Sequence, residues 1–132
     1  MSRLSIGAVA EATGLSVYAL RYFEHEGLFP RDIPRDTGGR RVYGQPDVDW
    51  LLLCNRLRES GMPIAVIKRF VDLVREGAGN EADRLALLRQ HEADVRAKID
   101  ELHACLTVIH RKVVSYEKHF AEGTATGLWE TS

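Results

Sequence analysis

Apolar positions in the first part of the chain recur every three or four residues, within short stretches that turn residues separate. The stretch IGAVAEA follows Ser5, a residue type that caps helices, and ends before Gly14. A second stretch starts after Ser16 and ends at Gly27, which suits the position just past a helix. The pattern therefore predicts two short helices joined by the turn ATGL, an arrangement typical of a helix-turn-helix.

The next segment, LFPRDIPRDTGGRRVYGQP, breaks the helical pattern. Its prolines and its Gly-Gly pair exclude a helix, so the residues on either side are expected to pair as a small hairpin. Beyond it, Pro46 and Asp47 open a third helix, DVDWLLLCNRLRES, which Gly61 stops. Pro63 suits the first turn of a fourth helix, IAVIKRFVDLV.

The second half of the chain shows a different pattern, in which apolar residues alternate at steps of three and four. Only Glu92 puts a charge into the series, and no Gly or Pro interrupts residues 81–122. This heptad pattern predicts one helix of roughly 35–40 residues, about 55 Å long. A head of about 75 residues cannot cover such a seam, so we expect it to pack on a second copy through Leu88, Val95, Ile99, Leu102, Leu106, Ile109 and Val113. A two-helix hairpin within the chain is the less favoured alternative.

Composition narrows the class of protein only slightly. The chain has 132 residues, 28% charged and 45% hydrophobic, with a formal net charge of −1. That charge does not by itself indicate a nucleic-acid binder, but a basic patch needs only local clustering, and the hairpin segment is the most locally basic loop. There is no run of about 18 apolar residues and no apolar signal core, so a cytoplasmic protein is expected.

The second predicted helix has an unusual outward face. Its apolar residues can face inward, which leaves Tyr18, Arg21, Tyr22 and His25 on the other side. Arginine can bond guanine with two hydrogen bonds and tyrosine can hold phosphate oxygens, so this face suits the DNA major groove. The plainer alternative is a solvated amphipathic helix in which Arg21 pairs with Glu24.

Several motifs in fixed order resemble the MerR family of transcription regulators. They read Ser-x-x-x-Leu-Arg-Tyr-Phe-Glu, x-x-Gly-Leu, Gly-x-Arg-x-Tyr and Asp-Val…Leu-Arg-x-x-Gly, and span residues 4 to about 75. The resemblance implies a mainly α fold, with a winged helix-turn-helix head over residues 1–76 and a coiled-coil dimerisation helix over 77–120. Residues 121–132 are expected to form a loose tail.

The resemblance also assigns contacts with DNA. It implies a homodimer on double-stranded promoter DNA in the bacterial cytoplasm, acting on RNA polymerase indirectly by bending and untwisting a promoter spacer. Carried over by motif, the groove and phosphate contacts would be Ser16, Tyr18, Arg21, Tyr22, Arg41, Tyr43 and Arg58. Arg40 stands where the family often has an apolar residue, and it either adds a phosphate contact or is simply solvated.

The signal that such a regulator senses is less evident. No cysteines occur where metal-sensing relatives have them, and the chain lacks the length for a ligand-binding domain. The Asp-Val-x-Trp opening of the third helix and the KVVSYE sequence resemble the small members that respond to aldehydes or electrophiles. Cys54 is then a candidate sensor, with packing in the third helix as the favoured alternative.

No cofactor, metal site or enzymatic activity is predicted. Two cysteines are too few for a thiolate cage, and His103, Cys105 and His110 do not share one helix face. No nucleophile–base pair, carboxylate pair or phosphate-binding glycine loop stands out. Two alternatives to a signal-responsive regulator remain: a coiled-coil module whose head binds protein, and an architectural DNA binder without a signal.

Overall fold

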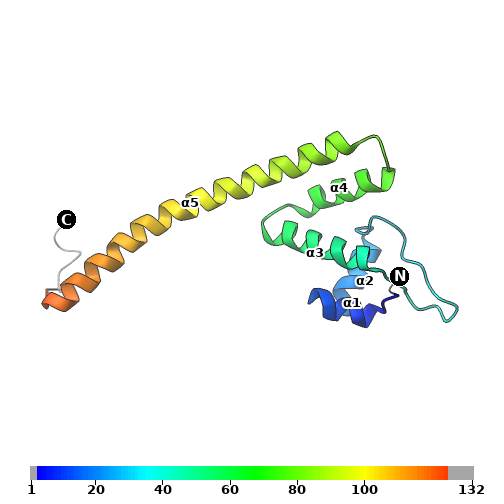
Figure 1. Cartoon of the computed structure of the whole chain (residues 1–132), viewed down its shortest axis with the longest axis horizontal. Helices are drawn as coiled ribbons and strands as arrows, with labels where there is room; N and C mark the ends of the chain where they lie inside the picture. The colour runs from blue at the N-terminus through cyan, green and yellow to red at the C-terminus, as the bar shows by residue number, and fades with distance from the viewer. Residues whose placement is uncertain (1–2, 125–132) are drawn as a thin grey trace. The chain divides into compact units, whose positions relative to one another are not determined.

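The computed structural model describes residues 3–124, which form five helices (Figure 1). The expected mainly α fold is confirmed. In chain order the helices are α1 (Ile6–Thr13), α2 (Val17–His25), α3 (Gln45–Glu59), α4 (Ile64–Glu76) and α5 (Glu81–Glu122). The chain divides into two compact units, Met1–His91 and Glu92–Ser132. We call residues 3–91 the head.

The ends of the first two helices follow the caps that the sequence predicts. The Ser5 hydroxyl accepts a hydrogen bond from the Ala8 amide at 3.1 Å, which satisfies one of the free amides at the start of α1. Gly14 ends α1 with φ of 74°, a left-handed conformation that glycine adopts without strain. At α4 the expectation is off by one residue, because Pro63 has extended backbone and precedes the helix.

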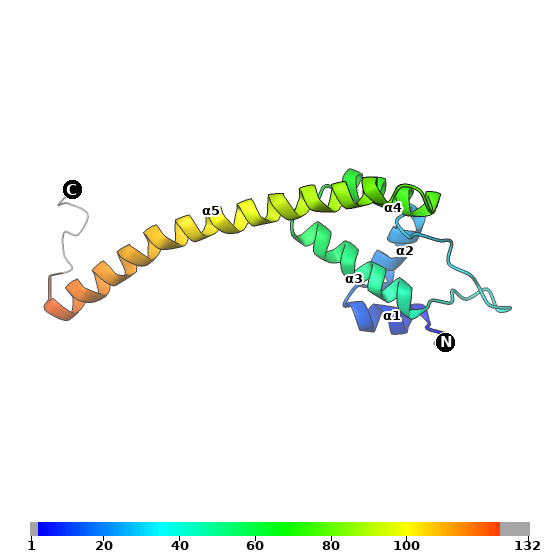
Figure 2. The same ribbon diagram turned by 45° about the horizontal axis from the view of Figure 1, so that its top comes forward.

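Helix α1 packs against both α2 and α3, and α3 also contacts α4 (Figures 1 and 2). Their apolar faces form one core, because helix periodicity places residues three or four apart on the same side. The Trp50 ring stacks on Phe70 with centroids 5.6 Å apart, and its indole N–H donates to the Leu28 carbonyl at 2.8 Å. The largest fully buried side chains are Tyr43, Phe29, Leu20, Leu28, Leu51, Ile67, Val9 and Val71.

A hairpin links α2 to α3 and projects from the head, in cyan in Figures 1 and 2. It confirms the predicted pairing through an antiparallel bridge between Arg35 and Arg41. A second bridge joins Leu4, just before α1, to Tyr43, with both backbone hydrogen bonds at 2.8 Å. The hairpin is therefore attached to the segment that precedes the first helix.

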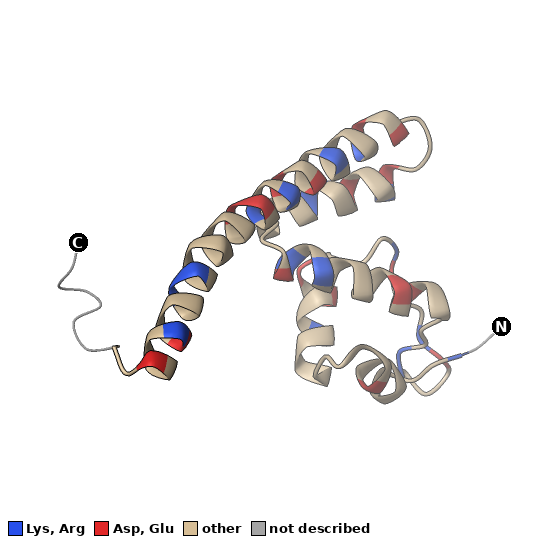
Figure 3. Cartoon of the chain, turned by 60° about the vertical axis from the view of Figure 1, so that its left-hand side comes forward, with Lys and Arg blue, Asp and Glu red and all other residues tan. Residues whose placement is uncertain are grey.

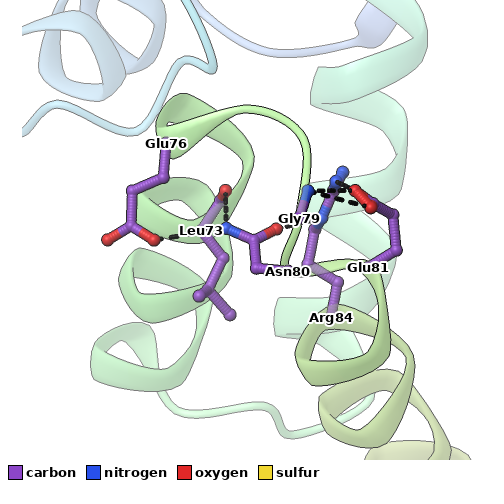
Figure 4. A network of polar contacts seen from close by, with 6 residues as sticks. All are labelled: Leu73, Glu76, Gly79, Asn80, Glu81 and Arg84. Carbon is purple, nitrogen blue, oxygen red and sulfur yellow. Dashed lines mark hydrogen bonds and ion pairs between the residues drawn. The ribbon is translucent and has the colours of Figure 1, made fainter.

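The turn between α4 and α5 contains a polar network (Figure 4). The Asn80 amide nitrogen donates to the Leu73 carbonyl at 2.7 Å, and its oxygen accepts from Arg84 Nε at 2.8 Å. Asn80 directly precedes α5, and its side chain bonds to the end of α4 and to the α5 side chain of Arg84. Both Glu81 oxygens accept from the Gly79 amide, which lowers the pKa of Glu81.

The start of α5 belongs to the head. Leu87 and Leu88 are partly buried against the head core, and the His91 ring lies 2.8 Å from the Ser60 hydroxyl. Leu88 therefore contacts the core of its own head, because the first turns of α5 lie beside that core, and its assignment to the dimer seam stays a prediction. Within the described residues, no helix is long and apolar enough to cross a membrane.

Candidate nucleic-acid interface

The proposed recognition helix is α2, whose position depends on a cap and two buried side chains. The Ser16 hydroxyl accepts a hydrogen bond from the Ala19 amide at 3.0 Å and so starts the helix. Leu20 and Phe23 are buried, which fixes the rotation of α2 on the core. Ser16 is exposed and its hydroxyl proton remains able to donate to a ligand.

The opposite face of α2 carries the side chains predicted to meet DNA. Tyr18 is 81% exposed and Tyr22 is 47% exposed, and Arg21 and His25 are exposed beside them. Arg21 does not pair with Glu24, the alternative considered from sequence, because the Glu24 carboxylate takes Arg41 at 2.6 Å. This face therefore presents a guanidinium and two phenol hydroxyls to the solvent.

Two carboxylates hold the hairpin in shape. Asp36 Oδ1 accepts from the Gly38 and Arg40 amides, both at 2.9 Å, which closes the tip and lowers the pKa of Asp36. Gly39 at the tip has φ of 79°, which a side chain would strain. At the base, Arg31 bonds both oxygens of the buried Asp47, and these hydrogen bonds raise the pKa of Arg31.

Asp47 also connects the hairpin to α3. Its Oδ2 accepts from the Gly44 amide at 2.8 Å, next to the first residue of the helix. The side chain is buried at 1% exposure, and it satisfies its charge through Arg31 and this amide. The sequence reading of Asp47 as a helix opener is thereby confirmed, and its role in holding the hairpin is an addition from the structure.

Two of the predicted wing contacts point inward. Tyr43 is 1% exposed, and its hydroxyl has no hydrogen-bond partner within the described residues. Burial raises the pKa of Tyr43, as does the nearby charge of Glu24. Arg41 is held by Glu24 with its side chain 21% exposed. A phosphate contact from either residue stays a prediction, and as placed these side chains brace the hairpin against the head.

The other predicted contacts remain at the surface. Arg40 is exposed, and Arg58 is exposed on α3 with its guanidinium carbon 5.9 Å from the centroid of the Phe23 ring. Arg58 also donates to Asn55 Oδ1 at 3.2 Å. The contact with Phe23 places the Arg58 charge next to α2.

Arg3, which precedes α1, and Arg35, which lies in the hairpin, were not singled out from the sequence. Arg3 precedes Leu4, which pairs with Tyr43. Both arginines line a concave surface that encloses a groove of about 650 Å³. The surface is formed by Arg3, Leu4, Ser5, Arg35, Asp36, Thr37, Arg40, Arg41 and Val42. Figure 3 shows Lys and Arg positions along the hairpin and the adjacent N-terminal segment. The β-type pairing of Leu4, which short sequence patterns do not reveal, is the signal for Arg3.

Cys54, the candidate sensor, lies inside the head. Its side chain is 1% exposed, and burial raises the pKa of the thiol to about 12. A thiol with so high a pKa is almost entirely protonated at neutral pH and is a poor nucleophile. These features favour the packing alternative. Among residues 3–124 no group of three or more His, Cys, Asp or Glu side chains could hold a metal ion.

The long helix carries the predicted seam as an exposed apolar surface. α5 has 42 residues, slightly more than the roughly 35–40 expected, and it is one continuous helix. No residue of α5 is buried. The exposed apolar side chains include Leu85, Ile99, Leu102, Leu106, Val108, Ile109, Val113, Val114 and Phe120. The expected tail falls mostly on residues 125–132, which lie outside the described part of the chain.

Comparisons with known proteins all indicate the same family. Residues 4–73 match the family model described as MerR HTH family regulatory protein, and residues 48–111 match that described as MerR, DNA binding. An HTH-type transcriptional regulator of Haemophilus influenzae is 35% identical over 119 residues, which covers 90% of this chain and 87% of that protein. The regulator AdhR of Bacillus subtilis is 31% identical over 98 residues, covering 74% and 66% of the two chains.

Solved structures agree with this assignment. The crystal structure of HiNmlR, a MerR family regulator lacking the sensor domain and bound to promoter DNA, has a TM-score of 0.83 and 32% identity. The match covers 96% of this chain and 95% of HiNmlR. A MerR family regulator from Listeria monocytogenes has a TM-score of 0.84 and 28% identity, over 91% and 90% of the two chains.

Proposed function

Because the chain belongs to the MerR family of helix-turn-helix transcription regulators, we propose that it binds promoter DNA as a homodimer. In this proposal each α2 enters the major groove of one half-site. The dimer sits in the spacer between two promoter elements and controls transcription by distorting that DNA. The protein acts in the cytoplasm, at the nucleoid when bound, and it is a regulator rather than an enzyme.

The observation that carries the proposal is the outward face of α2. The Arg21 side chain makes no ion pair or hydrogen bond within residues 3–124, so its guanidinium is available to a base edge. Tyr18 and Tyr22 flank it as exposed hydroxyl donors for phosphate oxygens. That HiNmlR, which is similar along nearly its whole length, was crystallised on promoter DNA supports the same ligand here.

Dimerisation is supported by the exposed seam on α5. Side chains such as Leu102 and Leu106 are 67% and 59% exposed, although each costs free energy when it is left in water. A second copy of the helix, carrying the same seam, covers them at no cost in buried polar groups. Two heads joined in this way would read two half-sites related by a two-fold axis.

Distortion of the DNA follows from the family mode of action. Bending a site of 20–30 base pairs costs on the order of 1–6 kcal/mol, which phosphate contacts from two heads can offset. A signal then needs only to change the relative stability of two dimer geometries. The Asp47-Val48-x-Trp50 opening of α3 and the KVVSYE end of α5 favour electrophiles as the class of signal. The buried Cys54 is not built to trap one.

The experiment that tests the proposal is capture of fragmented genomic DNA by the purified protein, followed by sequencing. We expect an inverted repeat located within promoter spacers, and circular-permutation gels should show that the bound fragment is bent. Retention of no fragment above background by a folded, dimeric protein would overturn DNA binding and favour a head that binds protein. A retained fragment that stays straight with and without electrophile stress would overturn the distortion mechanism.

A further inference from the structure

The four arginines that line the concave surface beside the hairpin fall into a pair held by Glu24 and an outward pair that Glu24 does not hold. Arg41 and Arg35 both face Glu24, at 2.6 and 3.8 Å. Arg3 and Arg40 are exposed, and neither has an ion pair or a side-chain hydrogen bond within residues 3–124. Arginines that already neutralise a carboxylate offer little to an incoming anion, so the outward pair is the one available for a ligand.

The concave surface beside the hairpin gathers positive charge. Of the residues that line it, Arg3, Arg35, Arg40 and Arg41 are cationic, and Asp36 is the one carboxylate. Asp36 Oδ1 already accepts two backbone amides at the hairpin tip. The charges of Arg40 and Arg3 both act on Asp36, so the two outward guanidinium groups lie within electrostatic reach of the same point. The surface can therefore bind an anion in addition to the Asp36 carboxylate.

The surface lies beside the recognition helix. One residue advances an α-helix by about 100°, so Glu24 falls on the flank of α2 between the buried Leu20 and the exposed Arg21. The salt bridge from Glu24 to Arg41 fixes the hairpin on that flank. A helix in the major groove, about 12 Å wide, has phosphate backbone along both sides. The strand on the Arg21 side would run past the hairpin.

We propose that Arg3 and Arg40 together hold one backbone phosphate of the DNA in which α2 lies. Arg3 comes from the segment before α1 and Arg40 from the hairpin tip, and the Leu4–Tyr43 pairing brings the two segments together. Thr37, at the same surface, supplies a hydroxyl donor. A guanidinium group donates paired N–H bonds to phosphate oxygens, so two guanidinium groups together form a strong phosphate-binding site. This inference rests on the proposed DNA binding.

The test uses the full-length protein and a duplex recovered by genomic capture, in which single phosphates are replaced by neutral methylphosphonates. With the wild-type chain, one replacement per half-site is expected to weaken binding roughly tenfold, as the loss of charge-assisted hydrogen bonds does. Arg3→Ala and Arg40→Ala should each weaken binding to the natural duplex by a similar factor. In both variants the same methylphosphonate should then have little further effect.

A second measurement is the dependence of affinity on salt. Loss of one neutralised phosphate lowers the slope of log K against log salt by about 0.9 for each head. The double variant should therefore show this reduction, while Arg111→Ala, an exposed arginine on α5, should leave both the slope and the methylphosphonate pattern unchanged. Neither outward side chain has an ion pair or a side-chain hydrogen bond within residues 3–124, so the melting temperature should change little.

The outcomes separate the two proposals. In one outcome, the wild-type chain binds the duplex while no single methylphosphonate loses its effect on affinity in both variants. In that case the shared phosphate site is wrong and DNA binding stands. The shared phosphate site is also wrong if Arg3→Ala and Arg40→Ala abolish the effect of methylphosphonates at two different positions. If the wild-type chain binds no duplex at all, the proposed function fails and this inference fails with it.

Discussion

The outward faces of α2 and α5 are both unusual for helices in water, and they differ in kind. The α2 face consists of an arginine, a histidine and two tyrosines, each with a polar tip that water can hydrogen-bond. The α5 face consists mainly of Leu, Ile and Val, which have no polar atoms to offer. The first face is stable alone and suits a polar ligand, whereas the second is incomplete without an apolar partner.

This difference predicts that substitutions on the two faces remove different properties of the protein. A change on α5 should remove the dimer and with it cooperative binding to two half-sites. A change on α2 should leave the dimer intact and remove affinity and sequence preference. Asp47, which connects the base of the hairpin to α3, should behave in a third way, because its loss should lower the stability of the head.

The largest effect is expected from Leu106→Glu on α5. Loss of a packed leucine costs roughly 2–5 kcal/mol, and in a symmetric dimer the substitution occurs twice, so the dimer should weaken roughly a thousandfold or more. Sedimentation equilibrium measures this change. Val108→Glu is the matched control, because Val108 is also apolar and exposed but lies outside the seam. Equal weakening by both variants would contradict the assigned seam.

Asp47→Ala should lower the free energy of unfolding by about 2–4 kcal/mol. The substitution removes both bonds to Arg31 and leaves the Gly44 amide without its acceptor. Chemical denaturation of the full chain measures the loss. Asp49→Ala removes an exposed carboxylate whose side-chain hydrogen bond within residues 3–124 is to Gln45, and it should cost a few tenths of a kcal/mol. An unchanged stability for Asp47→Ala would mean that the hairpin anchor contributes nothing.

Arg21→Ala should weaken binding to the selected DNA site by about 1–3 kcal/mol, or roughly 5- to 150-fold, and relax the preference for one base pair. The dimer should be unaffected, since Arg21 lies on the head and has no partner within residues 3–124. Fluorescence anisotropy with the natural and base-substituted sites measures both quantities. Equal loss of affinity for every sequence would instead assign Arg21 to a phosphate.

The smallest effect is expected when Cys54, the cysteine of the head, is exposed to a thiol reagent. In a Cys105→Ser background, Cys54 should not react with a thiol reagent in the native protein between pH 7 and 9. Its pKa of about 12 keeps the thiol protonated over this range, whereas an ordinary thiol with a pKa of about 8.5 becomes mostly thiolate. Reaction should appear only in denaturant. Native adducts with an aldehyde on Cys54, detected by mass spectrometry, would restore the sensor hypothesis.

Local patterns were sufficient for the elements and for the rotation of α2. Ser5, Ser16 and Gly14 end or begin helices where expected, because caps depend on residues within one turn. Leu20 and Phe23 are buried while Tyr18 and Tyr22 are exposed, because helix periodicity assigns each position to a face.

The contacts of the hairpin could not be obtained in the same way. Glu24 and Arg41 are 17 residues apart, and Arg41 follows the equally basic Arg40. Nothing in the sequence says which of the two arginines turns inward. The same holds for Tyr43, which motif matching places at DNA and the structure places in the core. Leu88 fits the heptad, and its partial burial against the head core is likewise not evident from the sequence.

The sequence by itself therefore determined the helices, their apolar faces and the family of this protein, because these depend on periodicity and on short motifs. Only the tertiary structure decided which charges pair across the hairpin and which arginines remain available to DNA. The physical reason is that a side chain's free energy depends on its neighbours in space. Whether a guanidinium meets a carboxylate or water is settled when the hairpin folds onto α2.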